Sequence, residues 1–164
     1  LQDAGQGEEA IRRFISRING TAIFCLKDLY ANTQLITKGF SEELVAYYER
    51  TITDQTYCPV PDFYGEEADL QEIEDAIAFE LQLLPAWLPH SIAEDAAADD
   101  VKEQIVQCYE KNIPDVARYM HGLEDVAGAV VNDEAPEEQF FDAVLKHALS
   151  VIEDKDQLVA QNEL

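Results

Sequence analysis

Apolar residues recur three or four positions apart along most of this chain, which is the spacing that places side chains on one face of an α-helix. A first stripe consists of Ile11, Phe14, Ile15 and Ile18. A second consists of Ala22, Leu26, Leu29, Thr33 and Ile36. No segment competes seriously as a strand, because none shows the alternation of Val, Ile or Thr with polar residues that a strand requires. The spacing therefore predicts an all-α protein.

Residues with special backbone preferences mark where the first predicted helices begin and end. We expect Asn19-Gly20 to end or kink the first helix. Lys38-Gly39 should end the second, because a basic last turn followed by glycine is a typical helix C-terminus. Ser41 is expected to cap a third helix, whose first turn is acidic.

Prolines divide the remainder of the chain. A fourth helix is expected from about Glu66 to Leu84, with Pro85 ending it. Pro114 and Pro136 suit the first position of later helices. The segment 56–65 contains two prolines and a glycine and is expected to be irregular. Together these signals predict a single-domain antiparallel helical bundle of six to seven helices over residues 1–153, with a frayed tail at 154–164.

Charge is distributed unevenly. The chain carries a formal net charge of -23, and no lysine or arginine lies between Arg50 and Lys102. That stretch holds thirteen carboxylates, whereas residues 1–50 are almost neutral. A surface of one sign repels nucleic acid and attracts basic surfaces, so the expected partner is a basic protein and direct nucleic-acid binding is not expected.

The predicted helix after Glu66 concentrates these acids on its outer side at a pitch of about 5 Å per turn. A row of carboxylates at this pitch resembles a nucleic-acid strand in charge density and could occupy a Lys/Arg groove built for phosphate. The predicted binding residues, which we call the acidic ridge, are Asp62, Tyr64, Glu66, Glu67, Asp69, Glu72, Glu74 and Asp75.

Two plainer explanations compete with a docking ridge. The acids could form an ordinary solvated helix face, although solubility alone needs only a modest charge of mixed sign. They could also reflect adaptation to high salt, which predicts uniform acidity. The near-neutral first 50 residues and the 19 Glu against 15 Asp favour the docking interpretation over this second alternative.

Aromatic residues flank the acidic stretch and have two interpretations. Tyr and Trp are frequent anchors of binding surfaces, but they more often fill the core. If exposed, they would make an aromatic and acidic docking face. The residues concerned are Tyr47, Tyr57, Phe63, Tyr64 and Trp87.

Catalytic and metal-binding motifs are missing from the sequence. There is no glycine-rich phosphate loop, GxSxG elbow or HExxH motif. The three histidines are His90, His121 and His147, and no acid lies three residues before any of them, as the di-iron bundle pattern requires. His121 and Glu124 share a helix face but fit a solvated pair better than a metal site. We therefore expect no enzyme activity, cofactor or metal.

Location is inferred from what the sequence lacks. No apolar run is long enough to span a membrane. Leu1 to Glu9 has no basic and apolar sections, so we expect no signal peptide there. Three widely spaced cysteines, Cys25, Cys58 and Cys108, do not form a disulfide framework. A reduced, cytoplasmic setting is expected.

These features favour a non-enzymatic acidic binding protein of the inhibitor, immunity or nucleic-acid-mimic type, docking on a basic protein such as a nucleic-acid-binding one. Two alternatives stay open. The first is a helical-bundle enzyme or carrier with a buried carboxylate/His site between helices. The second is a structural oligomer subunit that is acidic for solubility. The sequence fixes no oligomeric state.

Overall fold

The computed structural model describes residues 2–53, 70–95, 100, 102–104, 107 and 123–162. All regular elements within these ranges are helical, which confirms the predicted all-α class. Five helices have defined bounds: α1 (Gln2–Thr37), α2 (Ser41–Thr53), α3 (Leu70–Ile92), α5 (Glu124–Val131) and α6 (Glu137–Asn162).

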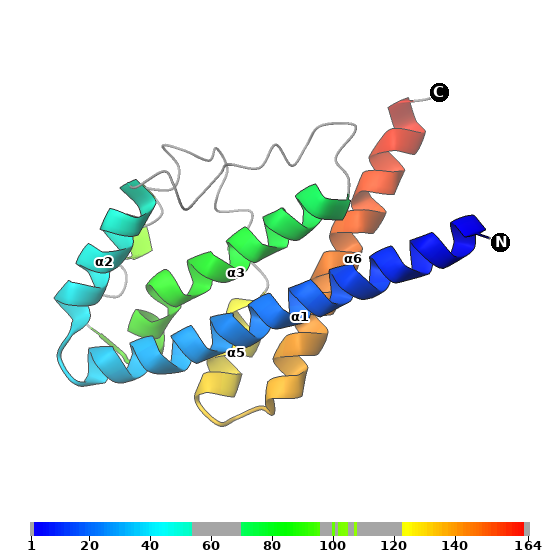
Figure 1. Ribbon diagram of the computed structural model, residues 1–164. Helices are drawn as coiled ribbons and strands as arrows, with labels where there is room; N and C mark the ends of the chain where they lie inside the picture. The colour runs from blue at the N-terminus through cyan, green and yellow to red at the C-terminus, as the bar shows by residue number, and fades with distance from the viewer. Residues whose placement is uncertain are drawn as a thin grey trace.

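The two central helices, α1 and α3, lie side by side and run in the same direction (Figure 1). Arg17 contacts Glu74 early in the pair and Asn32 contacts Pro85 late in it, so the residue numbers rise together. The parallel direction of this pair does not contradict the predicted antiparallel bundle, because alternate helices of an up-down-up order run the same way. Short loops force neighbouring helices to be antiparallel, but α2 and residues 54–69 separate α1 from α3 in the sequence.

The first helix is continuous where the sequence predicted an interruption. α1 passes through Asn19-Gly20 without a break, because its buried residues keep one register on both sides. A glycine inside a helix costs only about 1 kcal/mol, which packing along the whole helix outweighs. The buried positions are Phe14, Ile18, Ala22, Cys25, Leu26, Leu29, Asn32 and Ile36, whereas Ile11 and Ile15 of the predicted stripe are exposed.

The third helix continues through Pro85 and Pro89, so the prediction that Pro85 ends it is wrong. A proline has no N–H, and Pro89 therefore leaves the carbonyl of Pro85 without its helical donor. Asn32 replaces that donor: its side-chain amide donates to the Pro85 carbonyl at 2.9 Å and to the Tyr48 hydroxyl at 2.8 Å. One buried side chain on α1 thus stabilises a double-proline helix and binds α2 to it.

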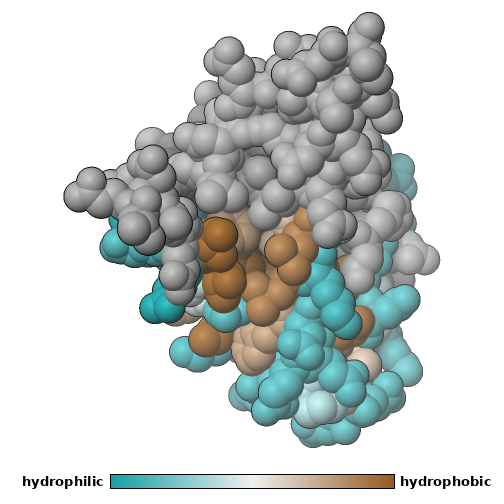
Figure 2. Space-filling view, turned by 90° about the vertical axis from the view of Figure 1, so that its right-hand side faces the viewer, coloured by the Kyte–Doolittle hydropathy of each residue, from teal (hydrophilic) through white to brown (hydrophobic). Residues whose placement is uncertain are grey.

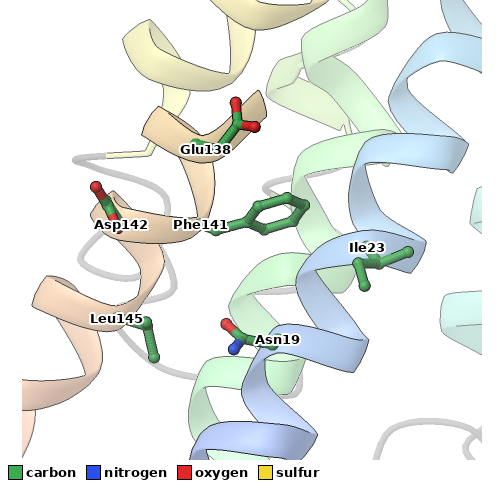
Figure 3. Close-up of a pocket in the computed structure, with 6 residues that line it drawn as sticks. All are labelled: Asn19, Ile23, Glu138, Phe141, Asp142 and Leu145. Carbon is green, nitrogen blue, oxygen red and sulfur yellow. The ribbon is translucent and has the colours of Figure 1, made fainter. Parts of the chain in front are cut away.

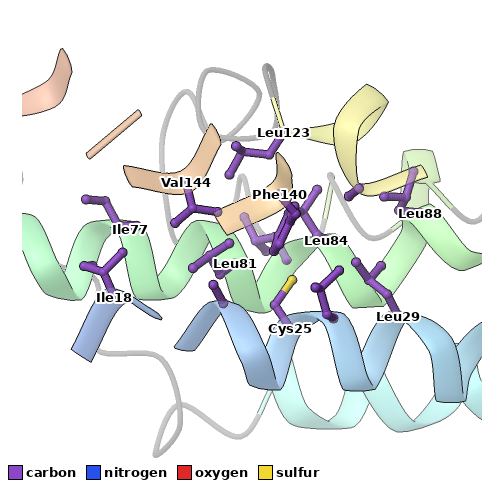
Figure 4. Close-up of a cluster of buried hydrophobic side chains, with 14 of the residues drawn as sticks. Ile18, Cys25, Leu29, Ile77, Leu81, Leu84, Leu88, Leu123, Phe140 and Val144 are labelled. Carbon is purple, nitrogen blue, oxygen red and sulfur yellow. The ribbon is translucent and has the colours of Figure 1, made fainter. Parts of the chain in front are cut away.

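The core lies where α1, α3 and α6 meet (Figure 4). α6 contributes Phe140, Val144 and Ala148, which follow one another at four-residue spacing and are buried. α3 contributes its inward row together with Trp87, which is only 2% exposed and packs in the core rather than on a docking face. Tyr47, the other flanking aromatic residue whose side chain is described, is exposed.

The second half of the chain differs from the predicted boundaries. α5 begins at Glu124, with Leu123 at its N-cap position. α6 carries helical backbone through Asn162, beyond the predicted start of the tail at residue 154. Segment 56–65 and Pro114 lie outside the described residues, as do Cys58 and Cys108.

Three helices end in the same way, with one residue of positive φ after the last turn. Gly39 ends α1 as the sequence predicted, with φ 90°. Glu94 occupies the same place after α3 with φ 49°. There the N–H of Asp95 donates to the His90 carbonyl at 3.0 Å, and the N–H of Glu94 donates to the Ser91 carbonyl at 3.2 Å. This is a Schellman ending, and Asp133 supplies a third one after α5.

Replacing Glu94 with glycine should stabilise the protein by about 1 kcal/mol, because a left-handed conformation costs a residue with a Cβ atom about that much. The measurement is the free energy of unfolding in urea. Gly39→Ala is the matched control and should lose a similar amount, since an added Cβ there meets no neighbouring atom and only the conformation is penalised. An unchanged or lower stability of Glu94→Gly would contradict this account.

Candidate functional site

The predicted acidic ridge lies mostly outside the part of the chain that the structure describes. Asp62, Tyr64, Glu66, Glu67 and Asp69 fall between the end of α2 and the start of α3. The backbone of Glu72 belongs to α3, but its side chain is outside the described set. Only Glu74 and Asp75 can be placed as side chains.

These two acids do not occupy the same environment. Glu74 is 15% exposed and accepts a hydrogen bond from Arg17 Nη1 at 3.0 Å. It lies at the α1–α3 contact, where a cation of the chain compensates its charge. Asp75 is exposed. The use of the acidic ridge as a binding surface stays a prediction. Within the fold, Glu74 pairs with Arg17 between α1 and α3.

A groove with acidic residues along one side lies between α1 and α6 (Figure 3). The groove has a volume of about 330 Å³. Asn19 and Ile23 line it from α1, and Glu138, Phe141, Asp142 and Leu145 line it from α6. Its walls are chiefly hydrophobic, with carboxylates on the α6 side.

The groove exists because α1 uses its main apolar stripe elsewhere. Phe14, Ile18 and Ala22 face the core, and Asn19 and Ile23 are displaced around the helix toward α6. Ile23 remains 43% exposed, and Leu149 on α6 remains 57% exposed. Figure 2 shows the side from which the start of α1 and the end of α6 project in Figure 1, and apolar side chains gather there between hydrophilic ones.

The acids of this region come from the turn after α5 and the start of α6. No lysine or arginine lies between Arg118 and Lys146 in the sequence. Five exposed acids lie in the turn after α5 and in the first turns of α6: Asp133, Glu134, Glu137, Glu138 and Asp142. They place a concentrated negative charge beside the apolar groove without a basic neighbour in the same segment.

One polar atom of the groove has no internal hydrogen bond. The Oδ1 atom of Asn19 is buried and has no partner among the described residues. Burying an unpartnered amide oxygen costs about 1–3 kcal/mol. No described residue therefore satisfies this acceptor on the α1 wall.

A Ser–His–Asp cluster joins the start of α2 to the end of α3. Ser41 Oγ donates to Asp95 Oδ2 at 2.7 Å, and His90 Nδ1 lies 3.2 Å from the same oxygen. Ser41 therefore contacts Asp95 with the hydroxyl that was predicted to cap α2. Oγ also lies 3.4 Å from Nδ1.

This cluster lacks the geometry of a nucleophilic triad. In such a triad the serine contacts one ring nitrogen and the carboxylate contacts the other. Here both contact Nδ1, while the buried Nε2 of His90 has no partner among the described residues. The serine also gives its proton to the carboxylate rather than to the imidazole. The arrangement holds α2 against the end of α3.

A second carboxylate/His pair lies between α3 and α6. Glu80 Oε2 is hydrogen-bonded to His147 Nε2, and Glu80 is buried. The hydrogen bond to Glu80 raises the pKa of His147, although burial opposes it. Burial raises the pKa of Glu80, although the bond to His147 opposes it. No pattern in the sequence indicated this partner of His147, which is 67 residues away.

Other kinds of site find little support within the described ranges. No group of three or more His, Cys, Asp or Glu side chains there could hold a metal ion. His121 lies outside them, and Glu124 is instead 3.7 Å from Lys102 Nζ. None of the helices searched in those ranges combines the length and apolar character needed to cross a bilayer.

Comparisons of the chain with protein-family models, curated proteins and solved structures gave no match. Sequence reasoning missed the groove, although one signal for it was present. The run between Arg118 and Lys146 is a second long stretch without lysine or arginine, and it precedes the exposed Leu149.

The Glu80–His147 pair should make the protein less stable as pH rises. Because the folded pKa of His147 is above its unfolded value of about 6.5, its stabilising effect is complete below that pH and is lost as pH rises through the raised value. The raised pKa of Glu80 acts in the same direction, because the folded pair holds its proton more tightly.

Urea unfolding at pH 6 and pH 8.5 tests this expectation. The midpoint should fall between the two pH values, and His147→Gln should reduce that fall, because glutamine can hydrogen-bond to Glu80 but does not titrate. Other groups contribute equally to both proteins, so the difference between the two slopes isolates the pair. Identical slopes would contradict the assignment.

Proposed function

We propose that this chain is a non-enzymatic binding protein whose α1–α6 groove holds an amphipathic helix from a basic protein. The observation that carries the proposal is the combination of an apolar lining, in which Ile23 is exposed and Phe141 and Leu145 are half-buried, with Glu138 and Asp142 on the same groove. A helix laid in a groove is a common recognition mode, in which apolar anchors give affinity and flanking charges give orientation.

Charge decides between the candidate occupants. A second copy of this chain would bring a net charge of -23 against an acidic surface and would be repelled. A helix with lysine or arginine beside its apolar stripe would be attracted. An anion or a nucleic acid would meet the same repulsion as a second copy. A basic protein therefore fits the groove best.

The partner is still the basic protein that the sequence predicted. Its contact surface, however, is the α1–α6 groove rather than the acidic ridge. The acidic ridge around α3 becomes a second, weaker candidate surface, because Glu74 is paired with Arg17. Steering by the whole acidic chain would still accelerate encounter with a basic partner.

Three further properties of the protein belong to the proposal: its helix arrangement, its location and its functional type. We propose that the complete chain forms one bundle of six to seven helices in which α6 runs antiparallel to α1. We also propose a cytoplasmic protein of the inhibitor, immunity or nucleic-acid-mimic type. The burial of the free thiol of Cys25, which raises its pKa and suppresses the reactive thiolate, is compatible with a reducing compartment.

Binding to a basic helical peptide tests the function. The probe is a synthetic 18-residue peptide with a leucine stripe and lysine at the other positions, followed by fluorescence anisotropy. Affinity should fall by about tenfold or more between low and high salt, because screening weakens the charge contribution. Glu138→Lys with Asp142→Lys should weaken binding by about tenfold, and Leu145→Glu should nearly abolish it by placing a charge on the apolar wall.

The control variant changes the net charge by the same amount, but on the acidic ridge rather than in the groove. Glu67→Lys with Asp75→Lys alters the predicted ridge and should have a much smaller effect. Equal losses from both double variants would show that total charge alone matters and would refute the groove. A larger loss of peptide affinity in the Glu67/Asp75 variant would show that the acidic ridge, and not the groove, is the binding surface. Circular dichroism of each variant confirms that helix content is unchanged.

A further inference from the structure

The side of α1 that faces away from the core carries exposed apolar residues. Gly20, Phe24, Ala31 and Leu35, which we call the outer stripe, lie within about 60° of one another around the helix axis. Phe24 is 67% exposed, Leu35 is 40% exposed, and Ala31 is exposed as well. A Cβ atom added at Gly20 would meet no atom within 4 Å, so the surface is open there too. The outer stripe lies about 100° around α1 from the groove, so it is a separate surface.

Small and large side chains alternate along the outer stripe, and this order makes it complementary to itself. When a second copy of α1 packs across the first in the opposite direction, with a two-fold axis between positions 27 and 28, Phe24 meets Ala31 of the second copy and Leu35 meets Gly20. The outermost of these contacts lies about 11 Å from the axis, which helices that cross at about 20° can reach. A two-fold axis makes every contact twice. Each large side chain therefore has a small one opposite, as close packing requires.

Charge identifies a second copy as the occupant of this face. α1 carries four acids and four bases, whereas the whole chain carries -23, so two copies approach one another through α1 with the least repulsion. In the same register each exposed Lys27 meets Asp28 of the other copy. Arg17 meets Lys38 at both ends, but Arg17 already pairs with Glu74 at 3.0 Å. A partner of one charge sign would find no match on a face whose charges are balanced.

We propose that this chain forms a two-fold symmetric dimer through the outer stripes of two antiparallel α1 helices. One pair of helices buries less surface than a standard protein–protein interface, so the dimer is weak. Repulsion between two chains of net charge -23 weakens it further at low salt. The α1–α6 groove of each copy lies on another side of α1 and stays open. The dimer thus presents two grooves, and its formation does not depend on the proposed function of either.

Sedimentation equilibrium of the chain tests the dimer. The measurements should cover protein concentrations from about 1 μM to about 1 mM, where a weak interface dissociates. The Kd of the dimer should fall by about tenfold between low and high salt, because screening reduces the repulsion between the copies. Peptide binding in the groove has the opposite salt dependence, so the two equilibria can be told apart.

Exchanging a large and a small residue tests the register. Phe24→Ala should weaken dimerisation by about tenfold or more, because it empties the contact with Ala31 twice in each dimer. Ala31→Phe should also weaken it, because two phenylalanines then collide. Phe24→Ala combined with Ala31→Phe places a large residue opposite a small one again and should return the Kd to within about threefold of the wild-type value. Leu149→Ala removes an apolar side chain of similar exposure from α6 and should have no effect.

Three results would overturn the proposal. A chain that stays monomeric at every concentration and salt forms no dimer. Equal Kd values for wild type and Phe24→Ala would place the interface on another surface. Stronger dimerisation of Ala31→Phe, or no recovery in the double variant, would show that general hydrophobicity and not the outer stripe drives association. None of these results bears on the groove, which the peptide measurements test independently.

Discussion

The structure depends on keeping α3 helical through two prolines. Pro89 cannot donate to the Pro85 carbonyl, and an unpartnered carbonyl at that buried position would destabilise the helix. Asn32 donates to it from α1 and donates its second N–H to Tyr48 of α2. This one amide fixes α3 beside α1, and the packing of α6 on α3 follows, because Leu81, Leu84 and their neighbours then face Phe140 and Val144 in one core.

That arrangement also explains why a groove remains beside α1. The strongest stripe of α1 is occupied by α3, so α6 packs against the flank of α1 with Phe140, Val144 and Ala148 directed into the core. Phe141 and Leu145 lie next to this row and line the groove instead. The apolar surface left open is thus a geometric consequence of three helices sharing one core.

The titratable groups of the interior serve the fold in two places. His90 and Ser41 both contact Asp95 where α2 meets the end of α3, and Glu80 contacts His147 where α3 meets α6. Each pair joins helices that are distant in the sequence. A polar group buried between helices needs a partner of suitable geometry, which restricts how the helices can slide past one another. The Asn19 acceptor stands apart, because its partner is absent from the described residues.

The sequence by itself determined the local properties of this protein. Helical spacing predicted the all-α class, Lys38-Gly39 marked the end of α1, and Pro136 marked the start of α6, because these signals depend on neighbours a few residues apart. The tertiary structure decided what happens at Asn19-Gly20 and at Pro85, where packing and the Asn32 amide outweigh local breaking tendencies. It also decided that Glu74 meets Arg17, that Glu80 meets His147 and that Asn19 lines a groove with Leu145. Such contacts join residues from 57 to more than 100 positions apart, and no periodicity within one helix specifies which helix will lie opposite.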